Sequence, residues 1–111
     1  MLATLALLSV IAPASAEIAN RTVKIGVLTD MSGPYADNVG PGSVLAAQMA
    51  VEDFGGKVGG MPIEVISADH QNKVDVGLGI ARRWYDTEGV DAITEVVVFG
   101  RRARRAAVDP R

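Results

Sequence analysis

The chain has 111 residues, no cysteine and a net charge of −2, which allows one modest domain without a disulfide framework and excludes a two-domain enzyme. Apolar residues make up 49% and charged residues 22% of the sequence, so the composition excludes a disordered or collagen-like chain. The charge is unevenly distributed. Residues 101–111 hold five arginines and one aspartate, a net charge of +4, whereas residues 1–100 carry a net charge of −6. Two kinds of sequence are therefore joined in one chain.

An apolar run opens the chain. Residues 1–16 are rich in Leu, Val, Ile and Ala, are broken by Pro13, and end in Ala14-Ser15-Ala16, the small residues that signal peptidases accept. The alternative, a membrane anchor, needs roughly 20 apolar residues. We therefore expect a secretory signal peptide over residues 1–16, a mature start at Glu17, and export to the periplasm.

The first regular element of the mature chain is predicted over Thr22–Thr29. This segment alternates loosely and then becomes nearly all apolar, which is typical of a strand buried on both faces of a parallel sheet. Residues 30–35 are dense in turn-forming types and predict a loop.

A helix is predicted next, over Ser43–Phe54, with Ser43 as its N-cap and Gly55-Gly56 as its end. Apolar residues recur at helical spacing and form one stripe: Val44, Ala47, Val51 and Phe54. We expect this stripe to pack on the sheet.

The rest of the chain repeats this alternation. After a Gly59-Gly60 turn, the sequence predicts a strand over Met61–Ala68, a polar loop over residues 69–72, a helix over Val74–Glu88 and a third strand beginning at Val90–Thr94. In the second helix the predicted inward stripe is Val74, Leu78, Ala81 and Tyr85, with Ile80 and Trp84 beside it.

The order of elements is β-α-β-α-β. Connections this short make right-handed crossovers between parallel strands, so the predicted fold class is α/β with a doubly wound parallel sheet that is incomplete. Residues 17–95 form the predicted domain.

Common site chemistries lack their signatures. Gly40-Pro41-Gly42 lies about ten residues after the strand, too far for the tight turn that a dinucleotide site needs. No phosphate-binding P-loop run is present, and a single histidine without cysteine cannot assemble a zinc site. Ser32 has no adjacent base, and His70 is expected to be a solvated loop residue. We expect no catalysis, no metal and no cofactor.

Polar residues follow the carboxyl ends of the first two predicted strands, the edge where open α/β sheets bind ligands. They are Asp30, Ser32, Tyr35, Asp69 and Asn72. The alternative is that these residues only build turns. For Ser32 and Tyr35 both interpretations stay open at this point.

Several of these segments together resemble a known family. The run from Val23 through Met31-Ser32-Gly33-Pro34, the helix with Ala47–Asp53, and the stretch from Ile80 to Ile93 resemble periplasmic substrate-binding proteins of the leucine/isoleucine/valine-binding type. The resemblance covers about Val23 to Thr94.

The resemblance implies a type I periplasmic binding protein, of which this chain would supply the first part of the N-terminal lobe. It implies binding without catalysis of a small solute, either a branched-chain amino acid or a related small acid or amide, with transfer to ABC permease subunits in the membrane. Ser32 and Tyr35 match the loop that lines the family's cleft. The alternative function is an exported ligand-sensing domain of the same fold.

The pattern breaks near residue 96. The family continues with a Ser/Thr-rich loop, whereas residues 96–111 contain the Arg-rich run Arg101–Arg105. We expect residues 96–111 to be out of frame or non-native. The alternative, a basic tail for nucleic acid or anionic lipid, fits poorly with an exported acidic body, so no nucleic acid partner is expected. We also expect this chain alone to be marginally stable and without measurable solute affinity.

Overall fold

Two long parallel strands form the centre of the structure, a computed structural model that describes residues 22–97. Strand β1 (Val23–Thr29) pairs along its whole length with β3 (Met61–Asp69), from Val23 opposite Ile63 to Thr29 opposite Asp69. Strand β4 (Ala92–Thr94) pairs in parallel with the other side of β1. The segment predicted to be a signal peptide and residues 98–111 lie outside the described residues.

A short hairpin, absent from the sequence prediction, extends the sheet. Strand β2 (Lys57–Val58) pairs antiparallel with the start of β3 across the Gly59-Gly60 turn, and both glycines have positive φ angles. The sheet order is β2-β3-β1-β4, so β1 lies inside the sheet with β4 at its edge. The predicted α/β class with parallel main strands is confirmed.

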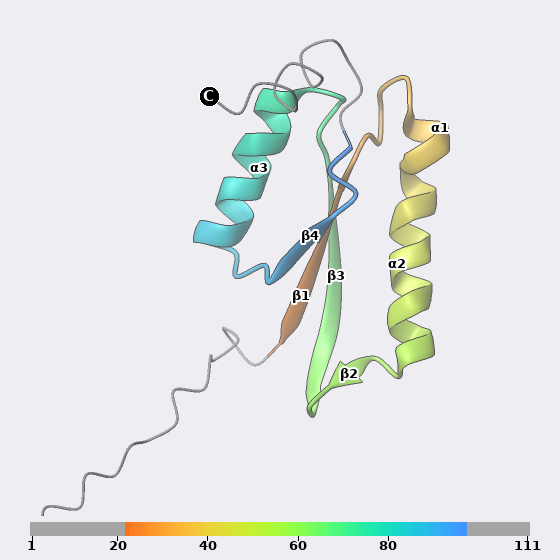
Figure 1. Cartoon of the computed structure of the whole chain (residues 1–111), viewed down its shortest axis with the longest axis vertical. Helices are drawn as coiled ribbons and strands as arrows, with labels where there is room; N and C mark the ends of the chain where they lie inside the picture. Colours follow the sequence, from red (N-terminus) through yellow and green to blue (C-terminus); the bar gives the residue numbers. More distant parts are fainter. Residues whose placement is uncertain (1–21, 98–111) are drawn as a thin grey trace, which may run out of the picture.

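Helices α2 (Pro41–Phe54) and α3 (Val74–Asp86) lie on opposite sides of the sheet (Figure 1). A one-turn helix, α1 (Ala36–Val39), precedes α2 and was not predicted. The predicted N-cap of α2 is wrong, because the helix begins at Pro41 with Gly40 as N-cap. Proline suits the first helical position, where its missing N–H has no partner to lose.

Helix α3 ends two residues earlier than predicted. Thr87 has a non-helical backbone, and its hydroxyl donates to the carbonyl of Arg83 over 2.8 Å. The chain then turns at Gly89, whose φ of 64° is left-handed. Gly89 therefore lies just past the helix end, at the position where glycine meets least steric resistance.

The enclosed core lies between the sheet and α3. Leu28, Trp84 and Val90 form its buried centre. The partly buried residues packed against this centre are Ile66, Ala68, Ile80, Ala81 and Ile93. The predicted inward stripe of α3 is therefore wrong for Val74, Leu78 and Tyr85, all of which are exposed. The bulkiest side chain of the helix sets its rotation, because Trp84 finds space over the bare backbone of Gly26.

The opposite side of the sheet is open. Val44, Ala47 and Val51 of α2 are half-buried as the predicted stripe requires, but Phe54 is 65% exposed. A groove of about 630 Å³ runs between α2 and the sheet. The two faces of the sheet are thus covered to different extents.

Candidate functional site

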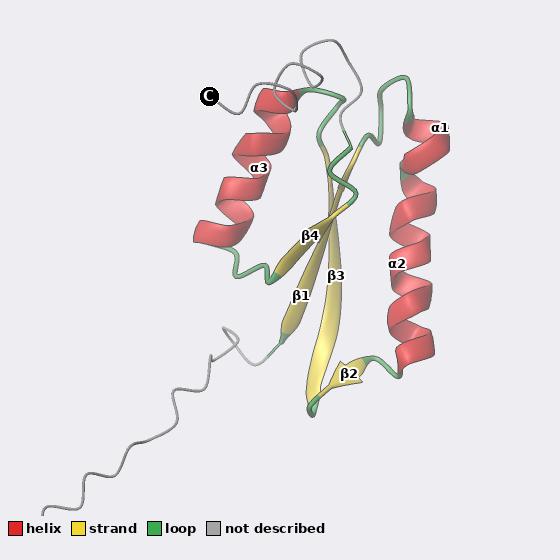
Figure 2. Ribbon diagram, viewed as in Figure 1, coloured by secondary structure: helices red, strands yellow, loops and turns green. Residues whose placement is uncertain are grey.

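Two loops meet at the carboxyl ends of β1 and β3, as Figure 2 shows. Because Thr29 and Asp69 are partners in the parallel ladder, the residues that follow them leave the sheet side by side. The ladder continues one step further, since the His70 N–H donates to the Thr29 carbonyl over 2.9 Å. The sequence prediction that both loops share one sheet edge is confirmed.

Asp69 joins the two loops. Its Oδ1 accepts the Met31 N–H over 2.9 Å and the Gln71 N–H over 2.7 Å, and its Oδ2 accepts the Ser32 hydroxyl over 2.5 Å. The carboxylate thus bonds both to its own loop and to a loop about 38 residues earlier in the chain. It fixes Met31 and Ser32 relative to the end of β3.

The environment of Asp69 favours its ionised form. Burial on its own would raise the pKa of the Asp69 carboxyl, but the hydrogen bonds from Ser32, Met31 and Gln71 outweigh burial, and the pKa is lowered. The neighbouring His70 adds a smaller effect in the same direction. Donors aimed at a carboxylate stabilise its charge. Asp69 is therefore an acceptor at neutral pH.

Asp30 holds the β1 loop from within. Its side chain is fully buried, with Oδ1 accepting the Gly33 N–H over 2.6 Å and Oδ2 accepting the Tyr35 N–H over 3.0 Å. A Cβ on Gly33 would lie 2.5 Å from Asp30 Oδ1, so only glycine allows this bond geometry. Asp30 is thus a turn-building residue, and its carboxylate faces the backbone of its own loop.

The two predicted ligand-binding residues, Ser32 and Tyr35, differ in their exposure and in the carboxylate to which they are bonded. Ser32 is exposed at the loop surface and is joined to Asp69, whereas Tyr35 is half-buried with its backbone N–H held by Asp30. The sequence placed Ser32 and Asp69 at the same edge but did not reveal their bond. The signal for this bond was the position of Asp69 at the end of β3. Asp69 is paired in the parallel ladder with Thr29, the residue at which β1 ends.

The prediction of a solvated His70 is wrong. Its side chain is 0% exposed, and its Nδ1 accepts the backbone N–H of Asn72 over 3.0 Å. That bond leaves the proton on Nε2, which is buried and has no hydrogen-bond partner among residues 22–97. His70 lies inside because it extends the strand ladder by one residue and packs beside Gly77 of α3.

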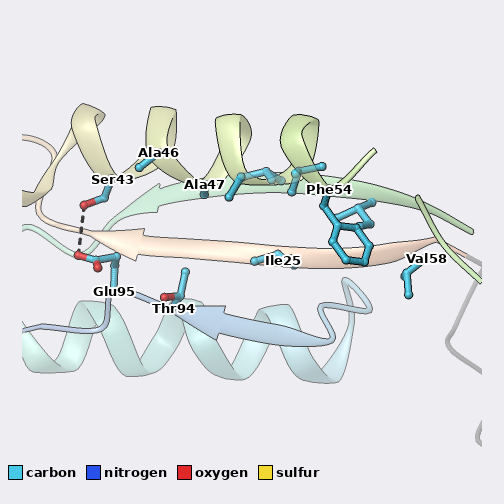
Figure 3. Close-up of a pocket in the computed structure, with 12 residues that line it drawn as sticks. Ile25, Ser43, Ala46, Ala47, Phe54, Val58, Thr94 and Glu95 are labelled. Atoms are coloured by element: carbon cyan, nitrogen blue, oxygen red, sulfur yellow. Dashed lines mark hydrogen bonds between the residues drawn. The ribbon is translucent and has the colours of Figure 1, made fainter. Parts of the chain in front are cut away.

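The groove beneath α2 is separate from the bonds that join the two loops. Its walls are mostly apolar, with Phe54 and Val58 near one end (Figure 3). At the other end the Ser43 hydroxyl donates to Glu95 Oε2 over 3.2 Å. Ser43, the third residue of α2, is therefore hydrogen-bonded to Glu95, which directly follows β4. The sequence predicted Ser43 as the N-cap of this helix.

Two further properties concern residues 22–97. Within this range no three metal-ligating side chains converge on one point. None of the helices within this range combines the length and the apolar character needed to cross a bilayer.

Comparison with known proteins places this arrangement in a family. A family described as periplasmic binding protein matches residues 22–109, which includes most of the segment expected from the sequence to be out of frame. That expectation about residues 96–111 stays a prediction, as does the export segment. No curated protein matches the chain.

Solved structures show the same fold. A branched-chain amino acid ABC transporter periplasmic ligand-binding protein from Burkholderia xenovorans is 59% identical, with a TM-score of 0.66 over 68% of this chain and 20% of its own. A periplasmic binding protein from Burkholderia mallei is 57% identical, with a TM-score of 0.64 over 66% of this chain and 20% of its own.

A third structure is more distant. It is an ABC transporter solute-binding protein from Rhodopseudomonas palustris in complex with 3,4-dihydroxybenzoic acid, 27% identical, with a TM-score of 0.57 over 66% of this chain and 20% of its own. This chain thus spans about one fifth of the length of each of these structures. The family match over most of the sequence and the shared sheet show that the chain belongs to the periplasmic binding protein family.

Proposed function

We propose that this chain supplies the beginning of the solute-binding lobe of an ABC importer's periplasmic binding protein. The observation that carries the proposal is the pair of loops joined by Asp69 at the carboxyl edge of the sheet. Open α/β sheets bind small molecules at that edge. Family membership and the importer proteins among the similar structures support the same role.

The proposed solute is a branched-chain amino acid or a related small acid or amide. The similar protein from B. xenovorans is a branched-chain amino acid transporter component, and the one from R. palustris holds an aromatic acid. We propose Ser32 and Tyr35 as ligand-binding residues. Ser32 is exposed at the loop surface, and both belong to the loop that Asp30 and Asp69 hold in place.

The proposed cellular role follows from the family. Residues 1–16 would direct export to the periplasm, and the solute would pass to permease subunits in the membrane. Binding proceeds without catalysis in this proposal. A sensing role for the same fold is tested by the neighbouring genes, since permease and ATPase genes beside this one favour transport.

Titration calorimetry on a chimera tests the proposal. In this chimera, residues 22–97 replace the structurally matching segment of the B. xenovorans protein, which supplies the parts that this chain does not span. We expect leucine or 3,4-dihydroxybenzoate to bind with micromolar affinity or better, and Ser32→Ala and Tyr35→Ala each to weaken the bound probe at least fivefold. A folded chimera that binds neither probe contradicts the proposed function.

Residues 96–111 are tested separately. We propose that they result from a change of reading frame, and sequencing the gene around codon 96 decides the matter. A shift there should restore a Ser/Thr-rich continuation like that of the family. A confirmed sequence in which no frame restores such a continuation contradicts the frameshift.

A further inference from the structure

We propose that Asp69 sets the hydrogen-bonding polarity of Ser32, so that the loop after β1 presents an acceptor, and not a donor, to the solute. The inference rests on the proposed function and refines it, because it names the chemical group of the solute that meets Ser32. Asp69 is a positioning residue here, and Ser32 is the residue that contacts the solute.

The hydroxyl proton of Ser32 is already engaged in a hydrogen bond to Asp69. A serine hydroxyl has one proton and two lone pairs, and the proton points to Asp69 Oδ2 over 2.5 Å. Hydrogen bonds to an ionised carboxylate are shorter and roughly twice as strong as neutral ones. Ser32 is an exposed residue, and its hydroxyl oxygen therefore offers only lone pairs to a molecule above the loop.

The orientation of Asp69 is fixed independently of Ser32. Two backbone N–H groups, from Met31 and Gln71, converge on Oδ1, which leaves Oδ2 as the oxygen that faces Ser32. Backbone donors in the two loops cannot rotate away as side chains can. Oδ2 of Asp69 therefore stays available to accept the Ser32 hydroxyl, and the hydroxyl proton stays directed at Asp69.

The other charged groups of these loops do not reverse this polarity. Asp30 is buried and its two oxygens accept the N–H groups of Gly33 and Tyr35. Lys73 directs its ammonium to Gln71 Oε1 over 3.4 Å. Neither group bonds to Ser32 or to Asp69 Oδ2, so the Ser32–Asp69 pair faces the solute as an acceptor.

The solute group that fits is a hydrogen-bond donor. The ammonium of an amino acid and the hydroxyl of an aromatic acid are two sources of the same chemistry. A carbonyl or carboxylate oxygen at this position would place lone pairs against lone pairs and leave a desolvated acceptor without a partner. The pair therefore selects for a donor-bearing solute over an analogue of equal shape that lacks the donor.

The experiment uses the chimera and two pairs of probes in titration calorimetry. Leucine is compared with 4-methyl-2-oxopentanoate, in which a keto oxygen replaces the ammonium, and 3,4-dihydroxybenzoate is compared with benzoate. The pair that binds identifies the source of the donor. We expect the donor-bearing member to bind at least 100-fold more tightly than its analogue.

Two variants isolate the role of Asp69. In Asp69→Asn the amide oxygen stays with the two backbone N–H groups, so the amide NH₂ faces Ser32 and the hydroxyl becomes free to donate. The preference for the donor-bearing probe should then fall at least tenfold. Ser32→Ala, at an exposed position, should weaken the donor-bearing probe at least fivefold and leave its analogue unchanged. Ser67→Ala, an exposed serine of β3, is the matched control and should change neither.

The outcomes separate the two proposals. If a probe binds but its preference over the analogue is unchanged in both Asp69→Asn and Ser32→Ala, the polarity inference is overturned and the proposed function stands. If Asp69→Asn does not fold, Ser32→Ala alone decides. If the folded chimera binds no probe, both proposals are contradicted.

Discussion

The backbone of Gly26 lies against the indole ring of Trp84. A Cβ at position 26 would be 2.5 Å from Cε3 of Trp84, which is closer than a Cβ atom approaches another side chain in real proteins. Gly26 lies on β1, and Trp84 is 2% exposed at the centre of the core that α3 makes with the sheet. The last turn of α3 and the middle of β1 therefore approach each other closely at this contact.

We predict that Gly26→Ala destabilises the chimera by about 1–3 kcal/mol, because overpacking a close-packed core forces side chains or backbone to shift. Thermal melting measures the effect. The matched control is Gly79→Ala in α3, where an added Cβ meets no atom within 4 Å. Helix propensity should make that control neutral or more stable by about 0.5–1 kcal/mol. Equal melting temperatures for Gly26→Ala and the parent would contradict the packing described.

A second prediction concerns the β1 loop. In Gly33→Ala the new methyl group would meet the Asp30 carboxylate, so the bonds to the backbone N–H groups of residues 33 and 35 should break. We expect solute affinity to fall at least tenfold in calorimetry. Gly42→Ala, where the added Cβ meets nothing within 4 Å, serves as the control and should bind like the parent. Full affinity in Gly33→Ala would show that the solute does not depend on this loop.

The third prediction is a pH dependence from Asp69. The pKa of this carboxyl is lower in the folded chain than its ordinary value, so ionised Asp69 adds stability above the ordinary value, roughly pH 4. That contribution is lost as pH falls through the lower folded pKa, because protonation then occurs in both states. Melting of the chimera between pH 2.5 and pH 6 should therefore show a loss at the acid end that is smaller in Asp69→Asn. If the melting temperatures of the parent chimera and of Asp69→Asn fell in parallel with pH, the stabilising role of ionised Asp69 would be contradicted.

The fourth prediction concerns the chain by itself. Its α2 side leaves a groove of about 630 Å³ open, with Phe54 and Leu45 exposed by more than half. Edge strand β4 has only three residues. We predict no cooperative thermal transition for residues 17–111 and no measurable leucine affinity. A sharp calorimetric transition, or micromolar leucine binding by the isolated chain, would contradict the prediction.

The sequence predicted the main strands well because their signals are local. The apolar run of β1 and the β-branched run of β3 each gave an element within one residue of the observed bounds. Glycines and turn-forming residues marked the segments between them. Alternating strands and helices then left few topologies to consider, and the parallel pairing followed.

The failures arose where tertiary contacts decide. Helical spacing alone favoured Leu78 and Tyr85 as inward residues of α3, but a side chain as large as Trp84 packs where Gly26 leaves space. The burial of His70 depends on a ladder bond to Thr29 from another part of the chain. The two-residue β2 is too short to produce a pattern of its own.

In the candidate site, too, local signals were predicted from the sequence and tertiary contacts were not. Sequence reasoning placed Ser32 and Asp69 at one edge of the sheet, since both follow strand ends. Their hydrogen bond depends on the register of β1 against β3, which no single segment encodes. The assignment of structural and binding roles among the loop residues therefore required the structure.

The most direct test of the account is a crystal structure of the chimera with the tighter-binding probe. We predict that the ammonium or hydroxyl of the probe lies about 3 Å from Ser32 Oγ, with the Ser32–Asp69 bond intact. A probe bound away from the loops after β1 and β3, with Ser32 in contact only with Asp69, would contradict the central claim that these loops carry the solute site.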